Sequence, residues 1–257
     1  MPSSILTHKS LQKRLKYSFL KRVEFFESIG STNDYAKELV ARGVESALIV
    51  ADEQTRGRGR FDRTWHADKG KNLTFSLLVS PHIPSQNFGI LPLLVSLGVA
   101  KGIGTHVAAD IVTKWPNDLL INGKKVCGIL LETVSSQPDK VVIGVGLNVN
   151  QSHFSPDLHA TSIFLERGKP VDRLALLDSI LHHLDWLVKQ PLESQLPVML
   201  AEWESRCSML KRTVRVRIED KTLTGVARGI ADDGALVLVL EGKEQRVYAG
   251  EVTILSS

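Results

Sequence analysis

The sequence predicts an α+β protein: a mixed β-sheet with flanking helices, followed by a small C-terminal β-barrel domain. Two patterns carry this prediction. Between residues 23 and 209, apolar runs of the kind found in buried strands alternate with stretches of helical periodicity. From residue 210 onward, strands of about five residues are separated by turn sequences, which is typical of a small barrel. With 257 residues, 43% of them hydrophobic, the chain can build one large domain and this appendage.

Residues 1–22 form a predicted short basic arm. They carry lysine and arginine but no acidic residue, and they lack the apolar segment of a secretory signal. We expect either a frayed arm or a short first helix.

A strand is expected at 23–29, and Ser31 then opens a helix. Ser31 and Asp34 have the spacing of a capping box, and Gly43 supplies the stop. A helix N-terminus also attracts anions and dipoles. The polar groups of Ser31, Thr32 and Asn33 are therefore candidate ligand contacts as well as caps.

The remaining elements of the large domain follow from apolar runs and periodicity. Strands are expected at 47–51, 73–77, 111–115 and 141–149, and helices at 89–104, 172–189 and 199–207.

Asn122-Gly123 is the strongest hairpin signal in the chain. On the returning strand, strict alternation places Lys125 on the same side as the apolar residues Cys127, Ile129 and Leu131. An ammonium at the mouth of an apolar face must meet an anion or reach out to water.

Residues 54–65, with the sequence QTRGRGRFDRTW, form the most unusual segment. Arginine holds phosphate or carboxylate through two parallel hydrogen bonds, and glycine lets a ligand approach the backbone. The segment predicts a mobile anion clamp. The alternative is a solvated basic loop or a contact with nucleic acid.

Several function classes are disfavoured. The net charge of +4 is too small to indicate nucleic-acid binding by itself. No apolar run reaches the roughly 18 residues of a membrane helix. Dinucleotide, P-loop, HExxH and Gly-x-Ser-x-Gly motifs are absent, and the scattered histidines predict no dedicated metal site. The two cysteines, Cys127 and Cys207, form no CxxC pair, which fits a reducing, cytoplasmic setting.

The motifs, in their order and spacing, closely resemble those of bacterial biotin protein ligases. They are Gly30-Ser31-Thr32-Asn33, Gln54, Gly57-Arg58-Gly59-Arg60-x-x-Arg63-x-Trp65, Lys114-Trp115-Pro116-Asn117-Asp118, Lys125 with Gly128, and Gly144-x-Gly146-x-Asn148. The arginine–glycine segment followed by Lys-Trp-Pro-Asn-Asp is highly specific as a pair.

The resemblance implies a catalytic domain of the class II aminoacyl-tRNA synthetase and biotin ligase type over residues 23–209, with an SH3-like domain over 210–257. It implies an ATP-dependent ligase that uses Mg²⁺, makes biotinyl-5′-AMP and transfers biotin to one lysine of the biotin carboxyl carrier protein of acetyl-CoA carboxylase. The acceptor lysine attacks directly, so no enzyme nucleophile is needed. Relatives often pair, so a homodimer is possible, and no membrane partner is expected. Relatives that act as repressors carry an N-terminal winged helix-turn-helix domain, for which 22 residues are too few, so no operator binding is expected.

The resemblance also implies roles for individual residues. Biotin would contact Ser31, Thr32, Asn33, Gln54, Arg58, Gly59, Arg60, Lys125 and Gly128. ATP and the adenylate would contact Arg58, Arg60, Arg63, Trp65, Asn117, Asp118, Lys125 and Asn148. Arg60 and Lys125 are the catalytic candidates, because cations must offset the repulsion when a carboxylate attacks an α-phosphate.

Three alternatives stay open at this point. A lipoate or octanoate ligase has a related fold but uses a different glycine- and histidine-containing signature. A non-catalytic biotin- or adenylate-binding protein would not need Arg60, Arg63 and Lys125 together. A nucleic-acid-binding module would need aromatics interleaved with basic strands, for which Phe61 and Trp65 alone are thin support.

Overall fold

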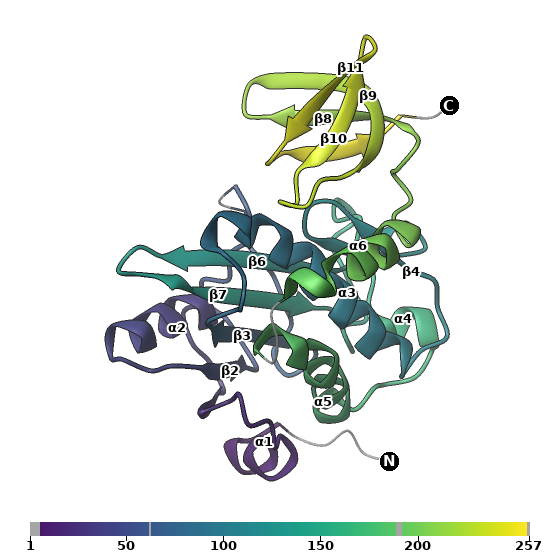
Figure 1. Ribbon diagram of the computed structural model, residues 1–257. Coiled ribbons are helices and arrows are strands. Elements are labelled where there is room, and N and C mark those ends of the chain that lie inside the picture. The colour runs from purple at the N-terminus through teal and green to yellow at the C-terminus, as the bar shows by residue number, and fades with distance from the viewer. Residues whose placement is uncertain (1–5, 62, 189–191, 256–257) are drawn as a thin grey trace.

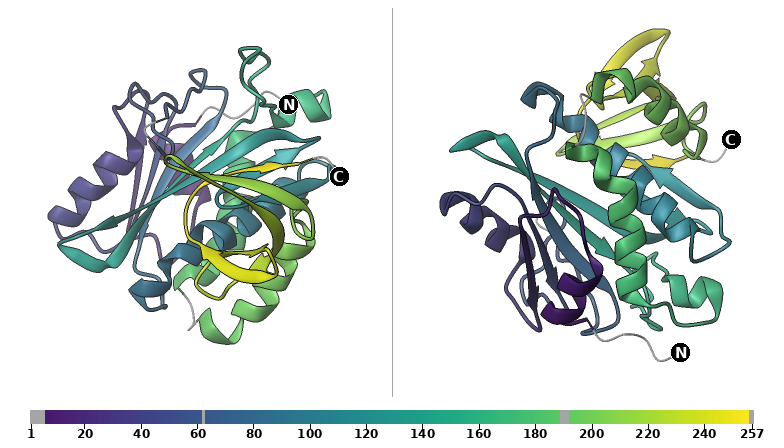
Figure 2. Two further views of the ribbon diagram at one scale, coloured as in Figure 1. Left: turned by 90° about the horizontal axis from the view of Figure 1, so that it is seen from above. Right: turned by 60° about the horizontal axis from the view of Figure 1, so that its bottom comes forward.

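The computed structural model describes residues 6–61, 63–188 and 192–255. The chain forms a large unit around a seven-stranded sheet and a smaller unit with a five-stranded sheet, which lies at one end of the large unit (Figures 1 and 2). The α+β class and the small C-terminal β domain predicted from the sequence are both confirmed.

The large sheet is mixed. Its order is β1-β2-β3-β7-β6-β5-β4. The pair β1–β2 is parallel and every other neighbouring pair is antiparallel. The strands are β1 (Arg22–Phe26), β2 (Ala47–Ala51), β3 (Leu73–Val79), β4 (Ile111–Lys114), β5 (Asp118–Ile121), β6 (Lys124–Val134) and β7 (Gln137–Leu147).

Helices cover both faces of this sheet. They are α1 (His8–Arg14), α2 (Thr32–Ala41), η1 (Ser85–Ile90), α3 (Leu91–Gly104), α4 (Ile163–Arg167), α5 (Arg173–Leu184), η2 (Asp185–Val188), η3 (Leu192–Ser194) and α6 (Leu196–Ser205). Alternate residues of β2 point to opposite sides: Leu48 and Val50 join the core of α1, α3 and α5, whereas Ala47 and Ile49 pack with α2. All seven residues of β3 are buried for the same reason.

The basic N-terminal segment contributes to the core where it is described. Of the two alternatives expected there, the structure has the short first helix, α1, capped by Thr7. Leu6, Leu11 and Leu15 are buried in the main core. The Tyr17 hydroxyl donates to the backbone carbonyl of Asp178 on α5 at 2.8 Å.

The helix expected at 89–104 is formed by η1 and α3. By length and composition, Ser85–Gly104 is the single described helix that could cross a membrane, and 72% of its apolar window is buried inside this protein. That burial is what a central core helix shows. The helix expected at 172–189 is α5 with η2, and residue 189 lies outside the described residues.

The small unit has the strand order β11-β10-β9-β8-β12. Its strands are β8 (Thr213–Ile218), β9 (Lys221–Ile230), β10 (Leu236–Leu240), β11 (Lys243–Val247) and β12 (Glu251–Ile254). Its core is continuous with α3 and α6 through Trp115 and Trp203. The indole of Trp115 donates to the Gly234 carbonyl at 3.0 Å, which ties the small sheet to the large unit.

Candidate active site

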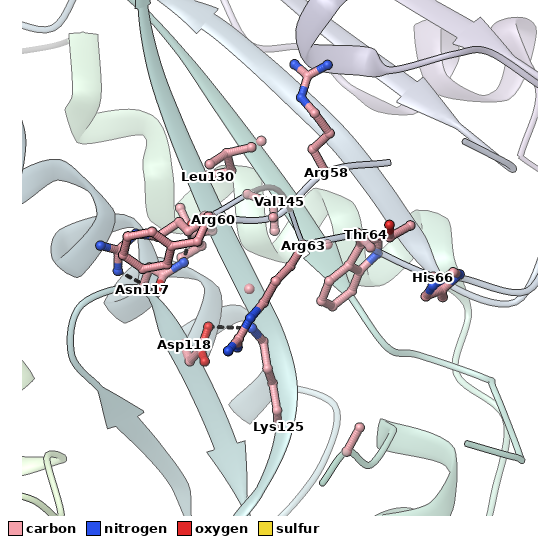
Figure 3. Close-up of a pocket in the computed structure, with 18 of the residues that line it drawn as sticks. Arg58, Arg60, Arg63, Thr64, His66, Asn117, Asp118, Lys125, Leu130 and Val145 are labelled. Atoms are coloured by element: carbon pink, nitrogen blue, oxygen red, sulfur yellow. Dashed lines mark hydrogen bonds and ion pairs between the residues drawn. The ribbon is translucent and has the colours of Figure 1, made fainter. Parts of the chain in front are cut away.

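A cavity of about 470 Å³ lies where the large sheet meets the small one. Its walls come from the N-terminus of α2, the described residues between 54 and 66, the β4–β5 connection, strands β6 and β7, residues 154–160 and residues 250–253. Figure 3 shows part of this lining, including Arg60, Asn117 and Lys125. The following predicted site residues all line it: Ser31, Thr32, Asn33, Gln54, Arg58, Gly59, Arg60, Arg63, Trp65, Asn117, Asp118, Lys125, Gly128 and Asn148. Their grouping is a property of the fold, and the role of each stays a prediction.

The N-terminus of α2 forms a polar wall. Ser31 caps the helix by accepting from the Asp34 amide at 3.3 Å. The amide and hydroxyl of Thr32 both donate to Gln54 Oε1, at 2.7 and 2.9 Å. Because these two hydrogen bonds fix the oxygen of Gln54 toward Thr32, its amide NH₂ group points away and can donate to another partner.

Asn33 is held rigidly beneath this wall. Its Nδ2 donates to Glu132 Oε2 at 2.7 Å, and its Oδ1 accepts from Ser76 at 2.6 Å. A Cβ atom added to Gly144 would lie 2.4 Å from Asn33 Oδ1. The glycine in β7 therefore makes room for a protein side chain.

The arginines of the loop point in different directions. Figure 3 shows Arg58 directed away from Arg63 and Lys125. Both terminal nitrogens of Arg58 donate hydrogen bonds to the Asp34 carboxylate, at 2.6 and 2.7 Å. The hydrogen bond from Arg58 holds the pKa of Asp34 below its ordinary value.

Arg60 and Arg63 lie on the side of the cavity that carries Asn117 and Asp118. Arg60 Nη1 is 3.5 Å from Asn117 Oδ1, and its guanidinium carbon lies 4.9 Å from the centre of the Phe61 ring. Burial lowers the pKa of Arg60, and the charges of Asp118 and Glu251 partly offset this. The exposed Arg63 forms an ion pair with Glu251.

Lys125 reaches the cavity because of a β-bulge. Leu119 pairs with Cys127 but Leu120 pairs with Lys125, so Val126 is extra. The bulge reverses the expected face of Lys125: its Nζ lies 2.7 Å from Asp118 Oδ1 in the cavity. The prediction that Lys125 shares a side with Cys127 was wrong. Cys127 itself is a buried core residue, as expected, and burial raises the pKa of its thiol.

Trp65 covers the floor of the cavity. A Cβ at Gly146 would lie 2.3 Å from its ring, and Lys125 Nζ lies 5.8 Å from the ring centre. Trp65 Nε1 and Asn148 Oδ1 are buried with no hydrogen-bond partner among the described residues. Orphaned polar atoms in a cavity are sites that a bound ligand can satisfy.

The motifs in the sequence did not single out three groups of residues that line the cavity or contact its lining. Ser76 and Glu132 lie within strands and carried no motif signal, although their contacts orient Thr32 and Asn33. The segment containing Leu158 and His159 runs beside Lys125, whose amide donates to the His159 carbonyl at 2.9 Å. Glu251 comes from the small sheet, and no local pattern could place it here.

Comparison with known proteins agrees with this site. A family model described as the biotin/lipoate A/B protein ligase family matches residues 25–148, and one for the biotin protein ligase C-terminal domain matches residues 210–255.

Individual relatives cover most of the chain. The biotin–[acetyl-CoA-carboxylase] ligase of Mycobacterium tuberculosis is 33% identical over 91% of this chain and 90% of its own. The bifunctional ligase/repressor BirA of Bacillus subtilis is 34% identical over 90% of this chain and 73% of its own. The biotin protein ligase of Aquifex aeolicus, in complex with biotin and ATP, superposes with a TM-score of 0.75 at 28% identity, covering 93% of this chain and 100% of that one. The chain therefore belongs to the biotin protein ligase family, and its activity is that of a biotin–[acetyl-CoA-carboxylase] ligase.

Proposed function

We propose that the chain activates biotin with ATP to biotinyl-5′-AMP and passes the biotinyl group to one lysine of the biotin carboxyl carrier protein of acetyl-CoA carboxylase. The main support is the composition of one cavity, where Lys125 and Arg60 lie beside the neutral polar wall of Thr32 and Gln54. Biotin matches this arrangement, because its neutral ureido ring suits the wall and its carboxylate suits the two cations.

In the first step, a biotin carboxylate oxygen bonds to the α-phosphorus, and pyrophosphate leaves with the electron pair of the broken P–O bond. Lys125 and Arg60 offset the repulsion between the two anions. Each charge-assisted hydrogen bond contributes about 1.5–3 kcal/mol. Before the ligand binds, the 2.7 Å ion pair with Asp118 holds the Lys125 ammonium in the cavity. The biotin carboxylate then replaces Asp118 as the partner of Lys125.

In the second step, the acceptor lysine attacks the acyl carbon, AMP leaves and the new amide nitrogen loses a proton. The mixed anhydride is sensitive to water, so a cover over it is useful. The loop that begins at Gly57 and ends at Trp65 supplies that cover, and its Arg60 lines the cavity 3.5 Å from Asn117 Oδ1.

The neutral wall holds the ureido ring of biotin. Gln54 donates to the ring through its NH₂ group, because its oxygen already accepts two hydrogen bonds from Thr32. Ser31 and Asn33 complete the wall together with the backbone of Arg58 and Gly59, and Gly128 leaves room beside Lys125.

The nucleotide lies on the opposite side. Arg63 leaves Glu251 for the ATP phosphates, since its exposed ion pair is readily exchanged. Trp65 packs against the nucleotide, and the orphaned Oδ1 of Asn148 accepts from the adenosine.

Asp118 and Asn117 fit a magnesium ion that arrives with ATP. Mg²⁺ in such enzymes is held by one or two carboxylates together with substrate phosphates. Asp118 offers one buried carboxylate oxygen, while the described residues hold no cluster of three metal-ligating side chains. When bound, the ion stabilises the charge of the departing pyrophosphate.

The decisive experiment incubates the protein with ATP, Mg²⁺, labelled biotin and a biotin carrier domain, with lipoate as the parallel substrate. We expect label on the carrier with biotin alone. Label only with lipoate favours the lipoate or octanoate ligase, and no label with either favours a non-catalytic binding protein.

Location and assembly complete the proposal. We place the enzyme in the cytoplasm, without a membrane partner and without sequence-specific DNA binding. Cell fractionation and an operator gel-shift assay test these two statements, and sedimentation tests whether the chain forms a homodimer.

A further inference from the structure

Within the described residues, 57–61 and 63–65 pair as a small hairpin whose base is held by backbone hydrogen bonds. The Trp65 amide donates to the Gly57 carbonyl at 3.0 Å, and the Gly59 amide donates to the Arg63 backbone carbonyl at 2.6 Å. Arg58 forms an isolated β-bridge with Thr64 near this base, and Arg60, Phe61 and Arg63 lie beyond it, at what we call the tip.

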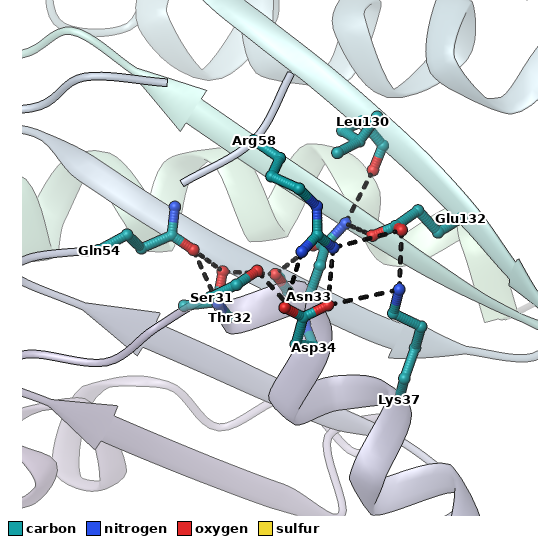
Figure 4. Close-up of polar contacts among 10 residues, drawn as sticks. Ser31, Thr32, Asn33, Asp34, Lys37, Gln54, Arg58, Leu130 and Glu132 are labelled. Atoms are coloured by element: carbon teal, nitrogen blue, oxygen red, sulfur yellow. Dashed lines mark hydrogen bonds and ion pairs between the residues drawn. The ribbon is translucent and has the colours of Figure 1, made fainter. Parts of the chain in front are cut away.

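The guanidinium of Arg58 is held outside the reacting part of the cavity. Besides its two-pronged pair with Asp34, it lies 3.5 Å from Glu132 Oε1 (Figure 4). Lys37 completes the group by contacting Glu132 at 2.8 Å and Asp34 at 3.4 Å. We call these four residues the Arg58 anchor.

The Arg58 anchor is more than an exposed surface pair. Its four side chains are only about a quarter to a third exposed, between 24% and 36%. Two cations and two anions balance each other, so the group carries no net charge. Networks with bidentate arginine geometry are the class of ion pair that does contribute measurably.

The anchor connects the loop to the biotin-binding wall. Asp34 lies one residue after Asn33 in the first turn of α2, and Glu132 accepts from Asn33 itself at 2.7 Å. These contacts tie the loop base to the helix that carries Ser31 and Thr32. Arg60 and Arg63 pair instead with Asn117 and Glu251, which lie outside the anchor.

We infer that Asp34 and Glu132 are positioning residues for the ligase reaction: by holding Arg58 they fix the base of the loop, so that its tip closes over the adenylate in one geometry. The inference rests on the proposed function of the loop as a cover. In this arrangement the side chain of Arg58 belongs to the anchor, and only the backbone of Arg58 contacts the ligand.

The test measures how fast biotinyl-5′-AMP leaves the enzyme. The adenylate is formed in place from labelled biotin, ATP and Mg²⁺, and its release is followed by filter binding after dilution. In Asp34→Asn and in Glu132→Gln, we expect the adenylate to be released about tenfold faster than from wild type. This factor corresponds to about 1.4 kcal/mol of lost interaction free energy. The midpoint of thermal unfolding is recorded for each variant, so that a folding defect is recognised.

Two further variants separate positioning from general damage. Glu38→Gln removes the exposed pair with Arg42 on the same helix, and release should stay at the wild-type rate. Arg58→Met should release the adenylate as fast as Asp34→Asn, and the double variant should be no faster, because both changes break one unit.

The outcomes are distinguishable. If the wild-type protein makes no adenylate at all, the proposed function fails and the anchor is not at issue. If wild type makes and retains the adenylate but the Asp34→Asn variant retains it equally well, or if the Asp34 and Arg58 effects simply add, the anchor is wrong and the proposed function stands.

Discussion

The ion pair between Lys125 and Asp118 defines the resting state of the site. The ammonium lies 2.7 Å from Asp118 Oδ1 and 5.8 Å from the centre of the Trp65 ring. A carboxylate that enters must compete with Asp118 for this cation, and two acids bring more negative charge than one ammonium can neutralise. Arg60 is the second cation close enough to share that charge.

Lys125→Ala should slow adenylate formation about 100-fold, because it removes one or two charge-assisted hydrogen bonds to the reacting anions. Pyrophosphate exchange measures this step, and transfer from added biotinyl-5′-AMP should change much less. The exposed neighbour gives the control: Lys124→Ala should exchange at the wild-type rate. Equal slowing of exchange and transfer would contradict the assignment.

Arg60→Gly should open the cover of the adenylate. The half-buried guanidinium stacks on Phe61 and faces Asn117, and glycine replaces both contacts with a freely rotating backbone. We expect faster adenylate release and labelling of bystander proteins, measured by blotting for biotin. Arg56→Gly, at an exposed position of the same segment, is the matched control. Unchanged release in Arg60→Gly would remove the closure role.

Strand β7 shapes the cavity through two missing side chains. Asn33 occupies the space beside Gly144, and Trp65 occupies the space beside Gly146. Both glycines face the cavity from the centre of the large sheet, where strands on either side prevent the backbone from moving away. The positions of the Trp65 ring and the Asn33 amide therefore depend on two residues of β7 that have no side chain.

Gly146→Ala should displace Trp65, because the new methyl group would lie 2.3 Å from its ring. We expect the KM for ATP to rise about tenfold, equivalent to about 1.4 kcal/mol of lost nucleotide binding, with the KM for biotin nearly unchanged. Tryptophan fluorescence should change in parallel. Gly104→Ala, where an added Cβ meets no atom within 4 Å, serves as the control. An unchanged KM for ATP would show that Trp65 does not support the nucleotide.

The two sheets meet at Glu251. Its carboxylate pairs with Arg63 from the loop and, at 2.6 Å, with Arg217 from β8 of the small sheet. A residue of the small unit thus holds a loop arginine that the proposed mechanism assigns to ATP. The small sheet is part of the cavity rather than a separate attachment, and its continuous core with α3 and α6 keeps it there.

Glu251→Gln should release Arg63 for the phosphates and lower the KM for ATP about two- to threefold, in line with the small energies of exposed ion pairs. Stability should barely change, and added salt should narrow the difference from wild type. Glu244→Gln breaks an exposed pair with Arg228 on the same small sheet and should leave the KM for ATP unchanged. A raised KM in Glu251→Gln would mean that Glu251 serves the nucleotide directly.

Much of the fold was predictable because its signals are local. The turn at Asn122-Gly123 has positive φ at both residues, +50° and +74°, as the hairpin signal requires. Ser31 caps α2, and the change of texture after residue 210 marks the five strands of the small sheet. The face of Lys125 was mispredicted, because a β-bulge depends on how two strands pair and not on the alternation within one strand.

The chemical inventory of the site was readable from the chain: the arginine–glycine loop, the capped helix, the Asn117-Asp118 pair and Lys125 all line one cavity. What remained hidden was the division of labour among the arginines. Arg58 turns to Asp34 and Glu132, Arg63 turns to Glu251, and Arg60 remains over the cavity. These partners lie up to 188 residues away in the chain (251 − 63), and the direction of a long charged side chain depends on which opposite charges the fold brings beside it.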